Sequence, residues 1–73
     1  MNVYVNVEPV EIVEGSTVAV LLSHLRIERE RVAVELNTDI LPKALYDSQL
    51  LSDGNRIEIV HFVGGGGSYG SKK

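Results

Sequence analysis

The sequence contains no cysteine. This absence excludes a disulfide framework and any zinc site built on thiolates. Because nothing in the composition requires an oxidising compartment, the expected location is the cytoplasm. The N-terminus has no basic segment followed by an apolar one, so no signal peptide is expected.

Clustered positive charge and long apolar runs are also missing. Seven Lys and Arg residues stand against ten Asp and Glu residues, for a net charge of −3, and only Lys72 and Lys73 are adjacent. Nucleic acid binding needs clustered bases that contact phosphates, so no nucleic acid partner is expected. The longest apolar run is residues 18–22. A membrane span needs ~20 such residues, so no membrane insertion is expected.

Residues that could bind a metal or support catalysis are few. His24 and His61 are predicted on different elements, with no acidic pair at ligand spacing, so no metal site is expected. Ser23 and His24 are neighbours in a predicted helix and do not face each other, so they form no catalytic pair. A chain of 73 residues has room for one small domain with a lean core, and no enclosed active site is expected.

The glycines divide the chain into two parts. Residues 1–63 contain two glycines, Gly15 and Gly54, whereas residues 64–73 contain five. A glycine-rich segment has almost no apolar surface to offset the entropy lost on ordering. We therefore expect a folded domain over residues 1–63 and a flexible tail over residues 64–73.

Residues 1–25 predict two strands and a helix. Met1, Val3, Val5 and Val7 alternate with polar residues, as in a half-buried strand, and a second alternating stretch follows after a tight turn at residues 8–9. Gly15 ends that second strand. Ser16 and Thr17 are N-cap candidates. The apolar positions that follow have helical spacing and predict an amphipathic helix: Val18, Leu21, Leu22 and Leu25.

The rest of the chain predicts two further strands. The charged residues 26–31 mix both signs and indicate a solvated connection. Residues 32–36 alternate and end at a turn at residues 38–39, with residues 40–41 as a short continuation that Pro42 stops. Residues 43–51 have mixed periodicity, and a short helix and an irregular crossing both remain open. After a turn at residues 52–55, residues 56–63 predict the last strand.

This element order indicates the fold class. One helix packed on one face of a mixed sheet is the compact two-layer solution for such an order. We therefore predict an α+β domain with the β-grasp, ubiquitin-like architecture.

The predicted last strand has apolar residues on both of its faces near its end. Ile57 and Ile59 share one face, whereas Val60 and Phe62 fall on the face of the charged Arg56. If the helix covers the isoleucines, Val60 and Phe62 form an exposed apolar pair beside the tail, which favours a partner contact. Alternatively, the strand bulges or residues 43–51 fold over the pair.

Four stretches together resemble the ThiS family, the sulfur-carrier proteins of thiamin biosynthesis. They are residues 14–18 (EGSTV), 32–37 (VAVELN), 40–42 (ILP) and, above all, 53–66 (DGNRIEIVHFVGGG). The resemblance covers residues 1–66. The last block is specific, because a DG turn, an isoleucine strand and a terminal HFVGGG are unlikely to occur together by chance. A Gly-Gly pair alone would be a weak signal.

The resemblance implies a carrier that is not itself an enzyme and binds no cofactor. In the family, a ubiquitin-activating-type adenylyltransferase uses ATP and magnesium to adenylate the C-terminal glycine, which then becomes a thiocarboxylate. The implied partners are this enzyme, thiazole synthase and a sulfur donor such as a cysteine desulfurase. The alignment places the reactive carboxylate on Gly66, with Gly67 as the next candidate. The implied partner-binding residues are Val60, Phe62, Val63, Gly64 and Gly65.

The chain departs from the family pattern after these glycines. Residues 67–73 continue (GSYGSKK), and a glycine within a chain has no free carboxylate. Either a protease trims the tail, or the extension is not native, or this copy is not a working carrier; a flexible linker is a further interpretation of the glycine run. Two other functions remain open. One is a MoaD-like sulfur carrier for molybdopterin synthesis, and the other is a β-grasp interaction domain with an inert tail.

Overall fold

The computed structural model describes residues 1–62, and the residues from Val63 onward lie outside the described part. Five strands form one mixed sheet in the order β2-β1-β5-β3-β4. β1 and β5 are parallel neighbours at its centre, and the other neighbouring strands are antiparallel. The strands are β1 (Asn2–Val5), β2 (Glu8–Glu11), β3 (Val32–Leu36), β4 (Asp39–Leu41) and β5 (Arg56–His61). The helical elements are α1 (Val18–His24) and the 3-10 turns η1 (Arg29–Arg31) and η2 (Lys43–Leu45).

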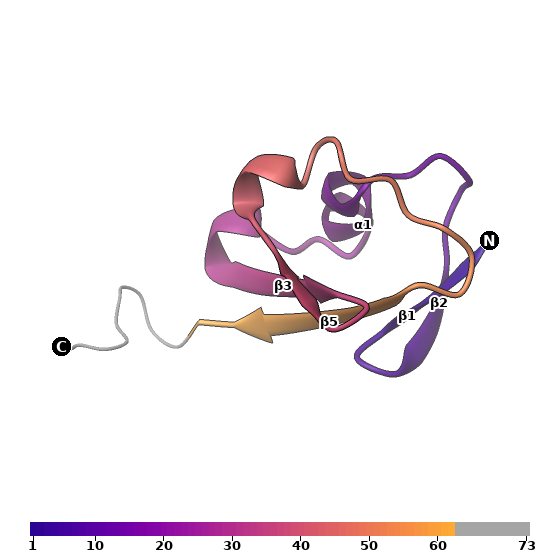
Figure 1. Cartoon of the computed structure of the whole chain (residues 1–73), viewed down its shortest axis with the longest axis horizontal. Coiled ribbons are helices and arrows are strands. Elements are labelled where there is room, and N and C mark those ends of the chain that lie inside the picture. The colour runs from indigo at the N-terminus through magenta and orange to yellow at the C-terminus, as the bar shows by residue number, and fades with distance from the viewer. Residues whose placement is uncertain (63–73) are drawn as a thin grey trace, which may run out of the picture.

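One face of the sheet is covered by α1 (Figure 1). The apolar positions predicted for this helix are its inward side, since Val18, Leu21 and Leu22 are all buried. They join the buried residues of β1, β3 and β5 in a single core. The mixed sheet with one helix on one face confirms the predicted α+β, β-grasp fold. No helix within residues 1–62 has the length and apolar character needed to cross a membrane.

The start of α1 follows the predicted capping chemistry. Thr17 is the N-cap, and its Oγ1 accepts a hydrogen bond of 3.2 Å from the Val20 main-chain N–H. Ser16, the other candidate, is buried instead, and its hydroxyl donates to the carbonyl of Val13. Leu25 is the C-cap residue rather than part of the helix.

The first hairpin turns earlier than predicted. The turn residues are Asn6 and Val7, with φ of 48° and 67°, so the prediction of a turn at residues 8–9 is wrong. Glu8 already pairs with Val5 in the sheet. Two-residue hairpin loops take positive φ because their twist then matches that of the flanking strands. Val7, predicted on the inner face, is 83% exposed as a result.

A second tight hairpin follows β3. Its turn residues are Asn37 and Thr38, again with positive φ, so the predicted turn at residues 38–39 is one residue too late, and Asp39 already pairs with Leu36. Residues 40–41 are therefore not a continuation of the third strand, as predicted, but part of a returning strand, β4, at the sheet edge.

Residues 43–51, which the sequence left open, are an irregular crossing that begins with η2. The crossing contributes two core side chains, Tyr46 and Leu51, which are 1% and 5% exposed. The charged connection before β3 also contains a short turn of helix, η1.

Candidate functional site at the C-terminal end of β5

The end of β5 presents the two faces that its sequence predicts. Ile57 and Ile59 point into the core. Val60 and Phe62 remain 56% and 41% exposed. The prediction that Val60 and Phe62 form an exposed apolar pair is therefore confirmed. Its role as a partner contact stays a prediction.

The sheet register identifies the residues beside this pair on the open face. Val60 lies opposite Ala33 on β3, and the next pair on the same face is Glu58 with Glu35. Ile40 on β4 lies opposite Glu35 and is 76% exposed. The open face therefore carries exposed apolar side chains next to two carboxylates.

The main chain of β5 is held on both sides near its end. On the β1 side, Asn6 donates to the Ile59 carbonyl at 3.2 Å and accepts from the Ile59 N–H at 2.8 Å, both through its side-chain amide. On the β3 side, the Phe62 N–H donates to the carbonyl of Arg31 at 2.9 Å. The main-chain hydrogen bonding of β5 therefore continues one residue beyond the strand, to Phe62.

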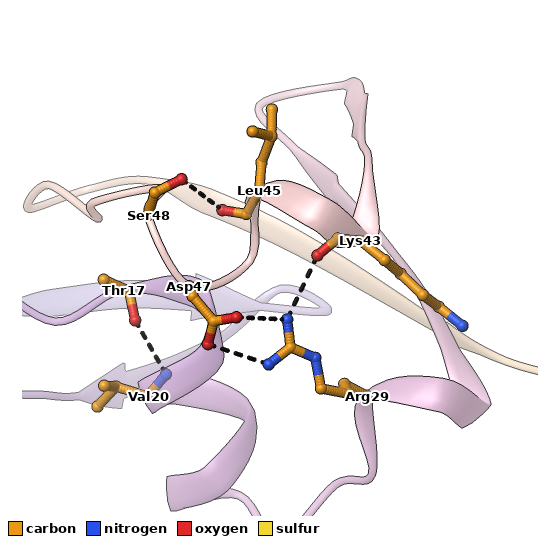
Figure 2. Close-up of polar contacts among 7 residues, drawn as sticks. All are labelled: Thr17, Val20, Arg29, Lys43, Leu45, Asp47 and Ser48. Atoms are coloured by element: carbon orange, nitrogen blue, oxygen red, sulfur yellow. Dashed lines mark hydrogen bonds and ion pairs between the residues drawn. The ribbon is translucent and has the colours of Figure 1, made fainter.

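A cluster of polar contacts joins η1 to the crossing (Figure 2). Nη1 and Nη2 of Arg29 each donate to one carboxylate oxygen of Asp47 at 3.0 Å, and Nη2 also donates to the Lys43 carbonyl at 3.3 Å. The guanidinium carbon lies 5.4 Å from the centre of the Tyr46 ring. Figure 2 shows the Arg29 guanidinium between Asp47 and the Lys43 main chain, with the Lys43 side chain directed away from this pair.

Arg29 and Asp47 shift each other's pKa. The hydrogen bond from Arg29 is the main reason why the pKa of Asp47 lies below its ordinary value. The same hydrogen bond raises the pKa of Arg29. Burial raises the pKa of Tyr46, and a hydrogen bond with the Val34 main chain opposes that shift.

Lys43 connects this cluster to the end of β5. Its Nζ donates to the Glu30 carbonyl at 3.2 Å and lies 5.4 Å from the centre of the Phe62 ring. The alternative prediction is that residues 43–51 fold over the apolar pair. The Lys43 side chain does lie over the Phe62 ring, but Val60 and Phe62 both keep much of their exposure.

The predicted site residues divide at the end of the described chain. Val60 and Phe62 lie together at the end of β5. The remaining predicted residues are Val63, Gly64, Gly65, Gly66 and Gly67, which lie outside residues 1–62. Within the described residues, no group of three His, Asp or Glu side chains could hold a metal ion.

Sequence reasoning missed the residues that hold the end of β5. Asn6 could have been found, because asparagine is a preferred residue in two-residue hairpin turns. Arg29 and Lys43 carry no such local signal, since their contacts lie 13 or more positions away in the chain.

Comparisons with known proteins agree with the fold and show the family. The family model described as the ThiS family matches residues 3–66. A sulfur carrier protein ThiS of Bacillus subtilis is 46% identical over 53 residues, which cover 73% of this chain and 80% of that protein. A crystal structure of the thiamine biosynthesis protein ThiS from Geobacter metallireducens superposes with a TM-score of 0.78 at 38% identity and covers 90% of this chain and all of that one.

Another relative is a much longer protein. A thiazole synthase of Paramagnetospirillum magneticum is 39% identical over 66 residues, which are 90% of this chain. Those residues make up 20% of that protein. In that relative, a segment similar to this chain is therefore joined to a larger polypeptide.

Proposed function

Because the chain belongs to the ThiS family, we propose that it is a sulfur carrier of thiamin biosynthesis whose C-terminal glycine carries the sulfur as a thiocarboxylate. The observation that supports this most is the extent of the family match, which runs from Val3 to Gly66. It takes in the β-grasp domain except for Met1 and Asn2, together with the first three glycines after Val63.

The chemistry requires activation by another enzyme. A carboxylate is a poor acyl donor until it has a good leaving group. An adenylyltransferase of the ubiquitin-activating type would join the glycine carboxylate to AMP, using ATP and magnesium and releasing pyrophosphate. The terminal sulfur of a persulfide on a donor such as a cysteine desulfurase would then attack the carbonyl carbon, and AMP would leave. A thiol would reduce the resulting acyl disulfide, which releases the donor and leaves the thiocarboxylate on the glycine. The carrier supplies the carboxylate and the docking surface, and catalysis belongs to its cytoplasmic partners.

Gly66 is the proposed reactive residue, and Gly67 is the next candidate. The family match ends at Gly66, which supports this register. Glycines suit the segment before it, because a backbone without Cβ atoms can enter a narrow nucleotide site without side-chain clashes. We assign this threading role to Val63, Gly64 and Gly65.

The folded domain would dock through the open end of β5. Among residues 1–62, Val60 and Phe62 are the exposed apolar residues nearest the glycines, so a partner that receives the tail would meet this pair beside it.

Thiazole synthase is the proposed acceptor of the sulfur. The segment similar to this chain within a longer thiazole synthase supports this pairing. Joining two units in one polypeptide raises their effective concentration, which benefits units that must meet.

The experiment compares three chains: all 73 residues, a chain ending at Gly66 and a chain ending at Gly67. Each is incubated with ATP, magnesium, the activating enzyme and a sulfur source, and its intact mass is then measured. We expect the Gly66 chain to exchange one oxygen for sulfur and the 73-residue chain to stay unchanged.

Two outcomes would count against the proposal. Sulfur on the uncut 73-residue chain would overturn the assignment to the glycines. Failure of both shortened chains would overturn the sulfur-carrier function itself. Folding serves as the control, because all three chains contain every residue of the described core.

A further inference from the structure

Lys43 contacts three residues in two separate parts of the chain. Its main-chain carbonyl accepts a hydrogen bond from Arg29, its ammonium donates to Glu30, and the same ammonium lies over the ring of Phe62. One residue of the crossing therefore contacts both η1 and the residue at the very end of the described chain.

The main chain of Lys43 is held by Arg29, which has further contacts of its own. The two hydrogen bonds between Arg29 and Asp47 are a forked, charge-assisted pair, which fixes geometry better than a single contact. Arg29 further packs over Tyr46, whose side chain is 1% exposed in the core. The main chain of Lys43 is thus tied through Arg29 to a rigid part of the fold.

Phe62 is the residue that this arrangement holds. Its N–H is bonded to Arg31 of η1, and its ring lies under the Lys43 ammonium. On the opposite edge of β5, the pairing with β1 ends at Val5 with Ile57, and Asn6 extends it to Ile59. The contacts of Phe62 therefore hold β5 beyond the point that β1 reaches.

We infer that Lys43 is a positioning residue that fixes Phe62 as the origin of the glycine tail. This inference rests on the proposed function. Four residues separate Phe62 from the end of Gly66, so the reactive carboxylate reaches at most ~14 Å from that origin. If β5 frayed back to Ile59, the tether would grow to seven residues. A longer tether lowers the effective concentration of the carboxylate at a partner's site and leaves more residues to be ordered on binding.

The first test measures amide hydrogen exchange of Phe62 in the full chain. Lys43→Met keeps the aliphatic stem and removes the charge, and it is expected to speed exchange of the Phe62 amide by about twofold to fivefold, the range of an exposed cation–π contact. Lys43→Arg restores a cation that can lie over a ring and should restore slow exchange. The urea midpoint should stay the same in both variants.

The matched control is Arg26→Met. Arg26 lies on the connection after α1, and within residues 1–62 its side chain makes no hydrogen bond or ion pair. The substitution removes one positive charge, as Lys43→Met does, without touching the contacts of Phe62. It should leave exchange of the Phe62 amide unchanged.

A double-mutant cycle guards against an indirect effect on folding. Phe62→Leu keeps an apolar side chain but removes the ring, so Lys43→Met should have no further effect on exchange of the residue 62 amide in that background. An equal effect in both backgrounds would show that Lys43 acts elsewhere, and the inference would be overturned.

The second test measures transfer kinetics with the chain ending at Gly66. Lys43→Met should raise the KM of the activating enzyme for the carrier by about twofold to fivefold and leave kcat unchanged, since chemistry on a bound tail does not depend on the tether. Lys43→Arg should return KM to the original value. An unchanged KM with a working wild-type carrier would overturn the inference alone. If no chain accepts sulfur, the proposed function fails, and the exchange measurements still decide whether Lys43 holds Phe62.

Discussion

The side-chain amide of Asn6 replaces a residue of β1 along the main chain of Ile59. Its Oδ1 accepts from the Ile59 N–H at 2.8 Å, and its Nδ2 donates to the Ile59 carbonyl at 3.2 Å. The main chain of Asn6 has already turned into the hairpin, with φ of 48°, a conformation that asparagine adopts more readily than most residues. One residue therefore makes the turn and extends the pairing of β5.

Replacing Asn6 by alanine should lower the free energy of unfolding by about 1–2 kcal/mol, because two hydrogen bonds to the sheet are lost. Urea denaturation measures this change. Asn6→Asp keeps the acceptor for the Ile59 N–H and should fall between the wild type and the alanine variant. Equal stability of all three proteins would contradict the role assigned to the Asn6 side chain.

Phe62→Ala should weaken partner binding more than it weakens folding, because the ring is partly exposed at the end of β5. Ile59→Ala is the matched comparison. Ile59 is 6% exposed, and its truncation should cost roughly 2–5 kcal/mol of stability. Urea unfolding and titration with thiazole synthase separate the two effects. A loss of stability in Phe62→Ala as large as that in Ile59→Ala would place Phe62 in the core.

Tyr46 should make the protein less stable at alkaline pH. Burial raises the pKa of Tyr46 in the folded state above its ordinary value of 10.0. The stability that the neutral Tyr46 side chain contributes is fully present below pH 10.0. As the pH rises further, the unfolded chain ionises first, so stability falls until the pKa of the folded state is passed. Tyr46→Phe should show a shallower loss of stability above pH 10 in urea titrations, and an identical slope in both proteins would contradict this assignment.

Asp47 should make the protein less stable at acidic pH. Its pKa in the folded state lies below the ordinary value of 3.8, because Arg29 donates hydrogen bonds to the carboxylate. The resulting stability is present above that value and is lost as the pH falls through the lower pKa of the folded state. The effect should be small, since the Asp47 side chain is 72% exposed. Asp47→Asn should remove it, and carboxyl chemical shifts recorded by NMR during acid titration should show Asp47 titrating below its ordinary value of 3.8.

Local patterns were enough to predict several elements. The helical spacing of apolar residues and a capping hydroxyl located α1, because both signals arise within one or two turns of chain. Alternation located β3 at residues 32–36. The same period-two pattern, read past Ile59, predicted that Val60 and Phe62 face outward.

The errors share one cause. Alternation shows which side chains share a face, but it does not show where a chain turns back or which strand it pairs with. Val7 continued the pattern of Val3 and Val5 and still lies in a turn, because the pairing of Glu8 with Val5 closes the hairpin there. Residues 40–41 likewise fit an extended strand, and only pairing with β3 made them a returning one.

By itself, the sequence determined the positions of α1 and β3, the inner and outer faces of the last strand and the glycine-rich end that follows it, since each depends on residues close together in the chain. The tertiary structure alone decided what holds the end of β5. Arg29 meets Asp47 from 18 positions away, and Lys43 reaches Phe62 from the far end of the crossing. Such contacts depend on how the crossing packs against the sheet through Tyr46, and no local periodicity encodes that packing.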